Sequence, residues 1–467
     1  MTSRHAKTTK AVRPARAGSL AAALLLLAAC AGSDDGRDDA SLDATPADSQ
    51  TSDDISDATD VTTTTASMTT TTFATPVTAT SVTATPVTTT PVTATPVTAT
   101  TSVAPAEPVR LNHIQVIGSH NSYHLVPQPA LFDGIVAVSA ELGRDIEYSH
   151  RTLTEQLDDF GIRQFELDVF ADPDGGLYAD RAANAVVGLP VESGEPALDE
   201  PGFKVMHTQD FDYETTCLTL VDCLGEISAW SDAHSSHVPI VVLVELKSLS
   251  VPEAAAEEGL ELDIGLPWAV PVETTADVLR QLDDEVRAIV GPDQLLEPDD
   301  VRGDADTLVE AVEGVGWPDL DSVRGRIIVA LNDEGAQRDL YIADSPVLAG
   351  RPMFTSSTPG APDAAFLRFD DPTDPELAAA AADGYLIRTR TDSPTVDARE
   401  NDVDRLEAAL ASGAHLLSTD YYEPSMFFDS PYVVALPDGA VARCNPVTAP
   451  VTCTPDRPAE ELEPGGT

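Results

Sequence analysis

Between residues 107 and 458, short apolar runs rich in β-forming residues alternate with stretches that have helical spacing. The runs are HIQVIGS, IRQFELDVF, FKVMHT, PIVVLVELK, RIIVALND, RPMFTSS, YLIRTRT and HLLSTDYY. Continuous apolar strands that alternate with helices are typical of a parallel sheet covered by helices. Eight strands in roughly 350 residues favour a closed barrel over a doubly wound sheet. We therefore predict an α/β fold, a (β/α)8 TIM-type barrel.

Helices are expected between several of these runs. Residues 274–290 and 402–411 have helical patterns, and Thr275 is a candidate N-cap of the first. The segments 171–203 and 250–273 are long and less regular, so we expect loops there and an imperfect barrel.

The first 29 residues resemble an export signal. Five basic residues precede the apolar run LAAALLLLAA, which is too short to span a bilayer, and Cys30 follows. The tetrapeptide LAAC resembles a bacterial lipobox, in which the cysteine is lipidated and becomes the first mature residue. An ordinary signal peptide or a signal anchor is the alternative. We predict a lipoprotein signal peptide over 1–29 and lipidation of Cys30.

The next segment, 30–106, is poor in residues that build a core. It is first rich in Asp and then in Thr, Ala, Val and Pro, with TPV recurring. Such tracts stay extended. We predict a disordered linker that tethers a catalytic barrel at 107–458 to a membrane, and a disordered tail at 459–467. The protein would be exported, either lipid-anchored at the outer face of the bacterial cell membrane or secreted, and monomeric.

Cysteine spacing agrees with export. Four cysteines remain beside Cys30, in two close pairs, and this favours the disulfides Cys217–Cys223 and Cys444–Cys453. A metal site is the alternative, but neither pair has the two-residue gap usual in zinc ligation.

The chain carries a formal net charge of −51. Such a surface repels nucleic acid and gains nothing from anionic lipid head groups, whereas it suits divalent cations or a salty habitat. Only two lysines follow the signal segment, Lys204 and Lys247.

Polar residues gather where the predicted strands end. They are His120, Asn121, Glu166, Asp168, His207, Glu245, Lys247 and Asp420. Residues two apart on a strand project from one face, as Glu166 and Asp168 do. Each residue also has a structural explanation: a hydrogen-bonded histidine, a solvated edge, or an ion pair between Glu245 and Lys247. Because successive strands repeat the pattern, we predict one shared site at the carboxyl ends of the strands.

The residue types indicate the chemistry of this site. Three carboxylates and one amide oxygen are hard ligands that suit calcium, or magnesium with more waters, rather than zinc. The histidines His120 and His207 would then be available for proton transfer. A dication with two imidazoles suits phosphodiester cleavage. No G-x-S-x-G nucleophile elbow is present.

The motifs resemble a known family. GSHNSYH, FELDVF, a later strand-end histidine and VELK follow the order found in the catalytic barrel of phosphoinositide-specific phospholipase C. The closer similarity is to the secreted calcium-dependent family of bacteria and fungi, through HTQDFDYETTCLTLVDCLGEISAWSDAHSSHVPIVVLVELK at 207–247. It continues through GWPDLDSVRGRIIVALND to GAHLLSTDYY and covers most of 110–425.

The resemblance implies a role for each matched residue. His120 and His207 match the catalytic histidines, and the calcium ligands would be Asn121, Glu166, Asp168 and Glu245. Lys247 would contact the phosphoryl group or the inositol of the substrate. The implied reaction begins with attack of the inositol 2-hydroxyl on phosphorus. It releases diacylglycerol and forms a cyclic inositol phosphate, whose ring water could then open.

Several residues depart from the family or stay open. The gap from Asp168 to His207 is longer than in eukaryotic catalytic domains, so 171–203 resembles an insertion. Arg388 and Arg390 are candidate substrate-binding residues, with salt bridges near the core as the alternative. Asp420 would orient a histidine or simply close the barrel.

Two other functions fit parts of the sequence. A glycerophosphodiester phosphodiesterase uses the same barrel, but it usually starts with H-R-G where this chain has HNS. A non-catalytic calcium-dependent surface binder would be expected to lack one histidine, whereas both are present.

Overall fold

The computed structural model describes residues 107–257, 264–393 and 395–453. The signal peptide, Cys30, the linker up to residue 106 and the whole tail at 459–467 lie outside these residues. The strands are β1 (Ile114–Ser119), β2 (Gln164–Asp172), β3 (Gly202–Val205), β4 (Ile240–Lys247), β5 (Ile327–Leu331), β6 (Phe354–Thr355), β7 (Phe366–Arg368), β8 (Leu386–Arg390), β9 (Leu416–Thr419) and β10 (Ala442–Cys444).

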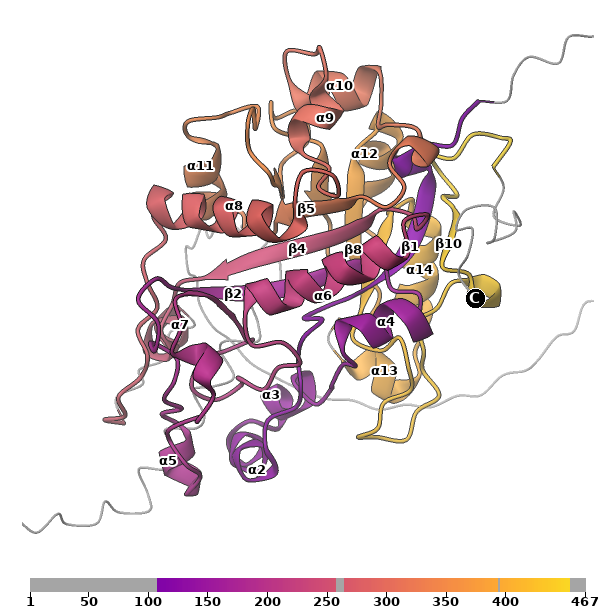
Figure 1. The fold of residues 1–467 in the computed structure, drawn as a ribbon. Coiled ribbons are helices and arrows are strands. Elements are labelled where there is room, and N and C mark those ends of the chain that lie inside the picture. The colour runs from indigo at the N-terminus through magenta and orange to yellow at the C-terminus, as the bar shows by residue number, and fades with distance from the viewer. Residues whose placement is uncertain (1–106, 258–263, 394, 454–467) are drawn as a thin grey trace, which may run out of the picture. The chain divides into compact units, whose positions relative to one another are not determined.

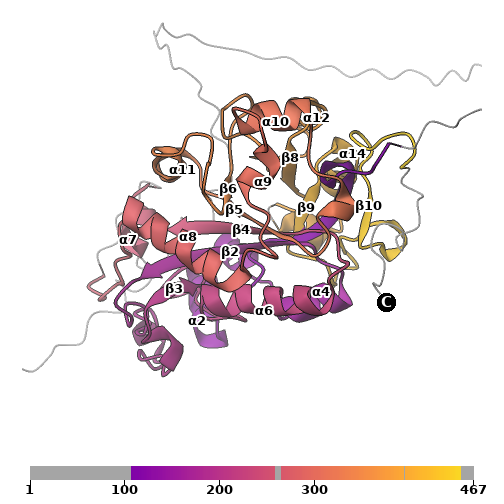
Figure 2. The same cartoon turned by 45° about the horizontal axis from the view of Figure 1, so that its top comes forward.

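Helices follow most of the strands (Figures 1 and 2). They are α2 (Pro129–Val138), α3 (Ala140–Asp145), α4 (Leu153–Asp159), α5 (Asn184–Val187), α6 (Leu220–Ala233), α7 (Val251–Glu257), α8 (Ala276–Val290), α9 (Pro298–Arg302), α10 (Leu308–Gly314), α11 (Gly335–Ile342), α12 (Leu377–Asp383), α13 (Val396–Glu400) and α14 (Asp404–Ser412). Short 3-10 turns are η2 (Leu111–His113), η3 (Pro196–Leu198), η4 (Leu320–Ser322) and η5 (Pro437–Gly439). The expected cap is present, since the Thr275 side chain accepts from the amide of Val278 at 3.3 Å.

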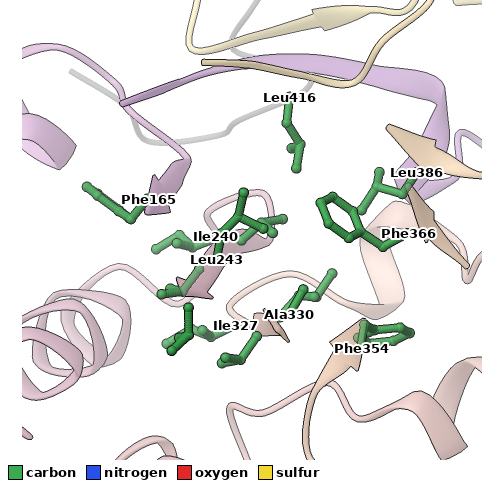
Figure 3. Packing of buried hydrophobic residues seen from close by; sticks show 14 of the residues in the cluster. Phe165, Ile240, Leu243, Ile327, Ala330, Phe354, Phe366, Leu386 and Leu416 are labelled. Atoms are coloured by element: carbon green, nitrogen blue, oxygen red, sulfur yellow. The ribbon is translucent and has the colours of Figure 1, made fainter. Parts of the chain in front are cut away.

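Eight parallel strands form a nearly closed ring in the order β6-β5-β4-β2-β1-β9-β8-β7 within the described residues. A bridge between Ser356 and Phe366 joins the two ends of this order. The predicted barrel is therefore confirmed. Buried side chains from separate strands, among them Leu243, Ala330 and Leu416, pack together inside it (Figure 3).

The prediction was wrong for one of the eight barrel strands. The run FKVMHT contributes β3, which pairs antiparallel with β2 and lies off the ring. The missing parallel strand is β7 at Phe366–Arg368, which the sequence analysis did not single out. A strand of three residues is too short to show a periodic pattern, so its identity depends on its neighbours in the sheet.

β1 and β2 share fewer paired residues than β2 and β4 do. Their register has one pair, Gly118 opposite Gln164, whereas β2 and β4 share seven pairs. Gly118 is required here, because a Cβ atom on it would lie 1.9 Å from Oε1 of Gln164. Further along, the amide of Ser122 donates to the carbonyl of Glu166 on β2 at 2.9 Å, and His120 and Asn121 lie between these two contacts.

Both expected disulfides are formed, Cys217–Cys223 and Cys444–Cys453. The first lies at the start of α6, and the second ties β10 to the chain that follows it. Within the described residues, no helix has the length and apolarity needed to cross a bilayer.

Candidate active site

Strand register brings the predicted site residues to one end of the barrel. Asp168 on β2 stands opposite Glu245 on β4, and Val244 stands opposite Leu331 on β5. Asn332, the residue after β5, therefore lies beside Glu245. Next to β2 in the ring, Ser119 of β1 stands opposite Thr419 of β9. His120 and Asp420, one residue further along each chain, are neighbours for that reason.

His207 reaches the same end by a different route. β2 continues beyond Asp168 to Asp172, and β3 runs back along this extension with Val205 opposite Val169. The amide of Met206 then bonds to the carbonyl of Asp168 at 3.3 Å. The antiparallel return thus delivers the next residue, His207, to the level of the carboxylates.

His120 is held by a buried carboxylate. Its Nδ1 lies 2.8 Å from Oδ1 of Asp420, whose Oδ2 accepts from Nη2 of Arg390 at 2.8 Å. Burial alone would raise the pKa of Asp420, but Arg390 and His120 lower it to about 2. Burial and Arg390 lower the pKa of His120, while Asp420 and Glu166 raise it by more, so the net shift is upward. Asp420 therefore orients a histidine, one of the two roles left open by the sequence.

His207 is held by a second buried carboxylate, and this one serves two histidines. Nδ1 of His207 lies 2.7 Å from Oδ2 of Asp212, and Nε2 of His124 lies 2.9 Å from Oδ1. Both histidines lower the pKa of Asp212 against the opposing effect of its burial. The side chains of His120 and His207 are 15% and 14% exposed, whereas the carboxylates below them are closed off from solvent. Each imidazole is therefore held by a buried carboxylate at Nδ1 and is partly exposed to solvent.

Asn121 has an unusual backbone conformation. Its φ of 42° lies in the left-handed region, which asparagine tolerates better than most residues. Its Nδ2 donates to the hydroxyl of Tyr148 at 3.2 Å. This contact uses the nitrogen and leaves the carboxamide oxygen as the ligand atom that Asn121 would offer.

The three predicted carboxylate ligands are linked by two nitrogen-bearing side chains. Nδ2 of Asn332 lies 3.1 Å from Oε1 of Glu166 and 3.2 Å from Oε2 of Glu245. Nζ of Lys247 lies 3.2 Å from Oδ2 of Asp168 and also contacts Oε1 of Glu245. Burial, Glu245 and Glu166 raise the pKa of Asp168 to about 6, while Lys247 and His207 act in the opposite direction. The like charges are crowded enough that a cation stabilises them.

This donor set fits calcium. Carboxylate and amide oxygens from Asn121, Glu166, Asp168 and Glu245 are the hard ligands that the ion takes. Oδ1 of Asn332 is buried beside two of these carboxylates and has no hydrogen-bond partner within the described part of the chain, which adds an unsatisfied oxygen to the cluster. When an ion enters, the ammonium of Lys247 would have to move away from the carboxylates, and the hydrogen bonds from the Asn332 side chain would have to break.

A tighter group of metal-ligating atoms lies next to this cluster. Among the described residues, atoms of His124, His207 and Asp212 lie within 4.8 Å of one another. Their two hydrogen bonds already account for this close approach, and two imidazoles suit softer metals than calcium. The oxygen cluster therefore stays the candidate calcium site.

The sequence family of the chain settles which enzymes it is related to. The family described as phosphoinositide phospholipase C, Ca2+-dependent, matches residues 109–446, more than half of the chain. The chain belongs to this phospholipase C family. The family consists of phosphoric diester hydrolases, so the protein is an enzyme of that class.

Solved structures of similar proteins include further phospholipases C. The calcium-dependent phosphoinositol-specific phospholipase C of Pseudomonas sp, a Gram-negative bacterium, is 16% identical with a TM-score of 0.43, and the match covers 72% of this chain and 95% of that chain. The calcium-dependent phosphatidylinositol-specific enzyme of Streptomyces antibioticus is 18% identical with a TM-score of 0.43, covering 70% and 99%. No curated protein matches the chain. The assignment of the chain to the phospholipase C family rests on the family match over residues 109–446 and not on these structures.

The two predicted substrate-binding arginines of this phospholipase C family member are engaged by carboxylates. Nη2 of Arg388 lies 2.8 Å from Oε2 of Glu166, and Arg388 also contacts Asp370. Arg390 pairs with Asp420 as described above. Both arginines are buried, at 1% and 3% exposed. The salt-bridge alternative describes their contacts, and binding of substrate by either one stays a prediction.

Sequence reasoning missed three residues of the site. Asn332 follows a predicted strand, so the rule that found Glu245 could have found it. His124 belongs to the same HNSYH motif as His120 but lies past the strand end. Asp212 lies on a loop five residues after His207, where no periodicity marks it. Only the contacts in the folded chain reveal that it joins two histidines.

Proposed function

We propose that this phospholipase C cleaves the glycerol–phosphate ester bond of phosphatidylinositol or a related inositol lipid. The products would be diacylglycerol and a cyclic inositol phosphate, which water could then open. One observation supports this proposal above the others. Two imidazoles, each fixed through Nδ1 on a buried carboxylate, adjoin a cluster of oxygen ligands, with His120 next to Asn121 and His207 at the level of Asp168.

The histidines would supply both proton transfers. Since Nδ1 of each ring is committed to a carboxylate, Nε2 is the atom that would exchange a proton with the substrate. One ring would accept the proton of the attacking inositol hydroxyl, and the other would donate a proton to the glycerol oxygen that leaves. The raised pKa of His120 favours its protonated form, which suits a group that faces a phosphate.

Asn121, Glu166, Asp168 and Glu245 would hold the calcium ion. When bound, calcium neutralises phosphate charge and lowers the pKa of a hydroxyl bound to it. Lys247 would present its ammonium to the phosphoryl group or the inositol from the same edge, because it projects from β4 two residues after Glu245. The contacts of Lys247 with Asp168 and Glu245 support this placement.

A lipid assay tests the proposal. The purified chain is incubated with phosphatidylinositol vesicles, with calcium and then with excess chelator, and diacylglycerol and cyclic inositol phosphate are measured. We expect both products with calcium and neither with chelator. Release that ignores the chelator would contradict the ligand assignment. Activity on water-soluble glycerophosphodiesters alone would favour a glycerophosphodiester phosphodiesterase, and binding without turnover would indicate a surface binder.

We also propose that the enzyme is exported as a monomer and tethered through a lipid on Cys30. Two disulfides within the barrel support an oxidising compartment. The test replaces Cys30 with Ser and follows the protein by cell fractionation. We expect wild type in the membrane fraction, and equal distribution of the two proteins would contradict the tether. Sedimentation of the purified chain checks the monomer.

A further inference from the structure

A cavity of about 540 Å³ lies outside the catalytic cluster. Its walls come from the segment that resembles an insertion and from the chain after the His207 loop. Among the residues that line it are Arg181, Asn184, Glu195, Tyr213, Glu214 and Thr216. Tyr213 directly follows Asp212, the carboxylate that holds His207. The proposed function makes no use of this cavity.

Arg181 is the most unusual residue of the cavity wall. It is 3% exposed, and its guanidinium lies 4.1 Å from the centre of the Tyr213 ring. Its Nη1 lies 3.7 Å from Sδ of Met206, while its Nε is buried and no described residue forms a hydrogen bond with it. No carboxylate of the described residues forms an ion pair with it. In contrast, Arg351 and Arg388 are also buried but pair with carboxylates at 2.7 and 2.8 Å.

A buried guanidinium is costly. Glu214, Asp210 and Glu195 offset part of that cost from a distance, and an anionic group within hydrogen-bond distance would offset more of it. A second donor in the same wall is also unsatisfied. Oγ1 of Thr216 is buried and has no hydrogen-bond partner among the described residues. Arg181 and Thr216 both line the cavity, although neither the Nε atom of the first nor the Oγ1 atom of the second is itself exposed to it.

The rest of the lining limits what this group can belong to. Five carboxylate side chains line the cavity with Arg181: Glu192, Glu195, Glu214, Asp222 and Glu226. A simple anion would be repelled by them and by the net charge of −51. A ligand that carries an ammonium beside its anionic group would instead be attracted at both ends.

We propose that this cavity binds a small zwitterion, with its phosphate or carboxylate on Arg181 and its ammonium among the carboxylates of the rim. The head group of a phospholipid and a free amino-alkyl phosphate share this chemistry. The segment 171–203 supplies Arg181, Asn184, Glu192 and Glu195 to the wall, which gives that insertion-like segment a role in binding.

Isothermal titration of the purified chain with phosphoethanolamine tests the proposal without any measurement of hydrolysis. We expect a dissociation constant of about 0.1–1 mM, a range typical of a ligand this small. Ethanolamine alone and inorganic phosphate alone should bind at least tenfold more weakly. Equal affinity for phosphate would overturn the proposal, as would the absence of binding at 20 mM phosphoethanolamine. Glycerophosphoethanolamine in place of the free compound distinguishes a lipid head group from a free metabolite by its relative affinity.

Two variants place the ligand in the cavity. Arg181→Met keeps the apolar stem on Tyr213 and should weaken binding at least tenfold. Glu195→Gln removes one rim charge on an exposed side chain and should weaken it severalfold while leaving the fold intact. Glu200→Gln is the matched control, an exposed residue of the same segment that does not line the cavity. Unchanged affinity in both Arg181→Met and Glu195→Gln would overturn the proposal. If Arg181→Met fails to fold, Glu195→Gln still decides it.

Discussion

The two histidine–carboxylate pairs of the site are built on different parts of the fold. His120 and Asp420 follow paired parallel strands of the barrel, β1 and β9, and an arginine anchors the carboxylate. His207 and Asp212 lie on a loop after the antiparallel strand β3, and the carboxylate is shared with His124 instead of an arginine. The first pair is positioned by the barrel, and the second by a structure added to it.

Because the two pairs are built differently, we expect their loss to affect folding stability and turnover to different degrees. The Asp420 pair belongs to an ionic network inside the barrel, so its loss should affect both folding and turnover. The Asp212 pair is buried but involves histidines alone, on a loop outside the ring of parallel strands, so its loss should affect turnover more than folding. The following predictions test that contrast.

Loss of either catalytic imidazole should have the largest effect. We expect His120→Ala and His207→Ala each to lower kcat by about 10³- to 10⁴-fold, because a positioned acid or base contributes on that order. The measurement is phosphatidylinositol cleavage, with a thermal melt to check folding. A substrate whose leaving group needs no proton should restore much of the activity of one variant and not of the other. Rescue of both, or of neither, would contradict the division into one acid and one base.

Removal of the carboxylates should distinguish the pairs. Asp420→Asn removes the charge that Arg390 contacts at 2.8 Å, so we expect the free energy of unfolding to fall by about 3–5 kcal/mol. Asp212→Asn should cost about 1 kcal/mol, since it leaves no arginine behind. Both should lower kcat, by about 100-fold. Urea denaturation measures the first quantity, and equal losses of stability would contradict the contrast.

Titration should also distinguish the pKa values of two neighbouring histidines at the first pair, His120 and His150. The pKa of His120 is raised, whereas burial lowers that of His150, whose Nε2 lies 2.8 Å from the carbonyl of His120, to about 4. Because the unfolded chain protonates His150 near pH 6.5, the folded state loses up to about 3 kcal/mol through this residue as the pH falls from 6.5 to 4. His120 contributes in the opposite direction: its stabilisation is full below pH 6.5 and is lost as the pH rises through its folded pKa. Histidine NMR of the calcium-free chain should show His120 titrating above His150, and the reverse order would contradict the account.

Loss of His124, the second histidine on the shared carboxylate, should give the smallest effect. His124→Leu leaves Asp212 with His207 alone, and we expect kcat to fall about tenfold with little change in KM. His124→Gln can still donate to Asp212, so it should recover most of this loss. If both variants lost the same activity, His124 would be a packing residue rather than one that positions His207.

The sequence was a good guide where strands are regular. The motifs that end β1, β2 and β4 predicted Glu166, Asp168 and Glu245 at one end of a barrel, because side-chain alternation and parallel pairing leave few other arrangements. The disulfide pairs followed from spacing and compartment. These inferences depend on local periodicity, which a single sequence contains.

The sequence was a poor guide to residues whose position depends on contacts between distant segments of the chain. FKVMHT has the composition of a barrel strand, and only its pairing with the extension of β2 shows that it runs antiparallel. Asp212 reaches His124 across 88 residues of chain, which no local pattern encodes. The cavity beside Arg181 arises for the same reason, since its two walls come from separate segments.

A crystal structure of the enzyme grown with calcium tests the central claim most directly. The account predicts one ion, identified by its anomalous signal, with oxygen atoms of Asn121, Glu166, Asp168 and Glu245 at about 2.3–2.6 Å and Lys247 displaced from the carboxylates. An ion on His124, His207 and Asp212, or none at this end of the barrel, would contradict it.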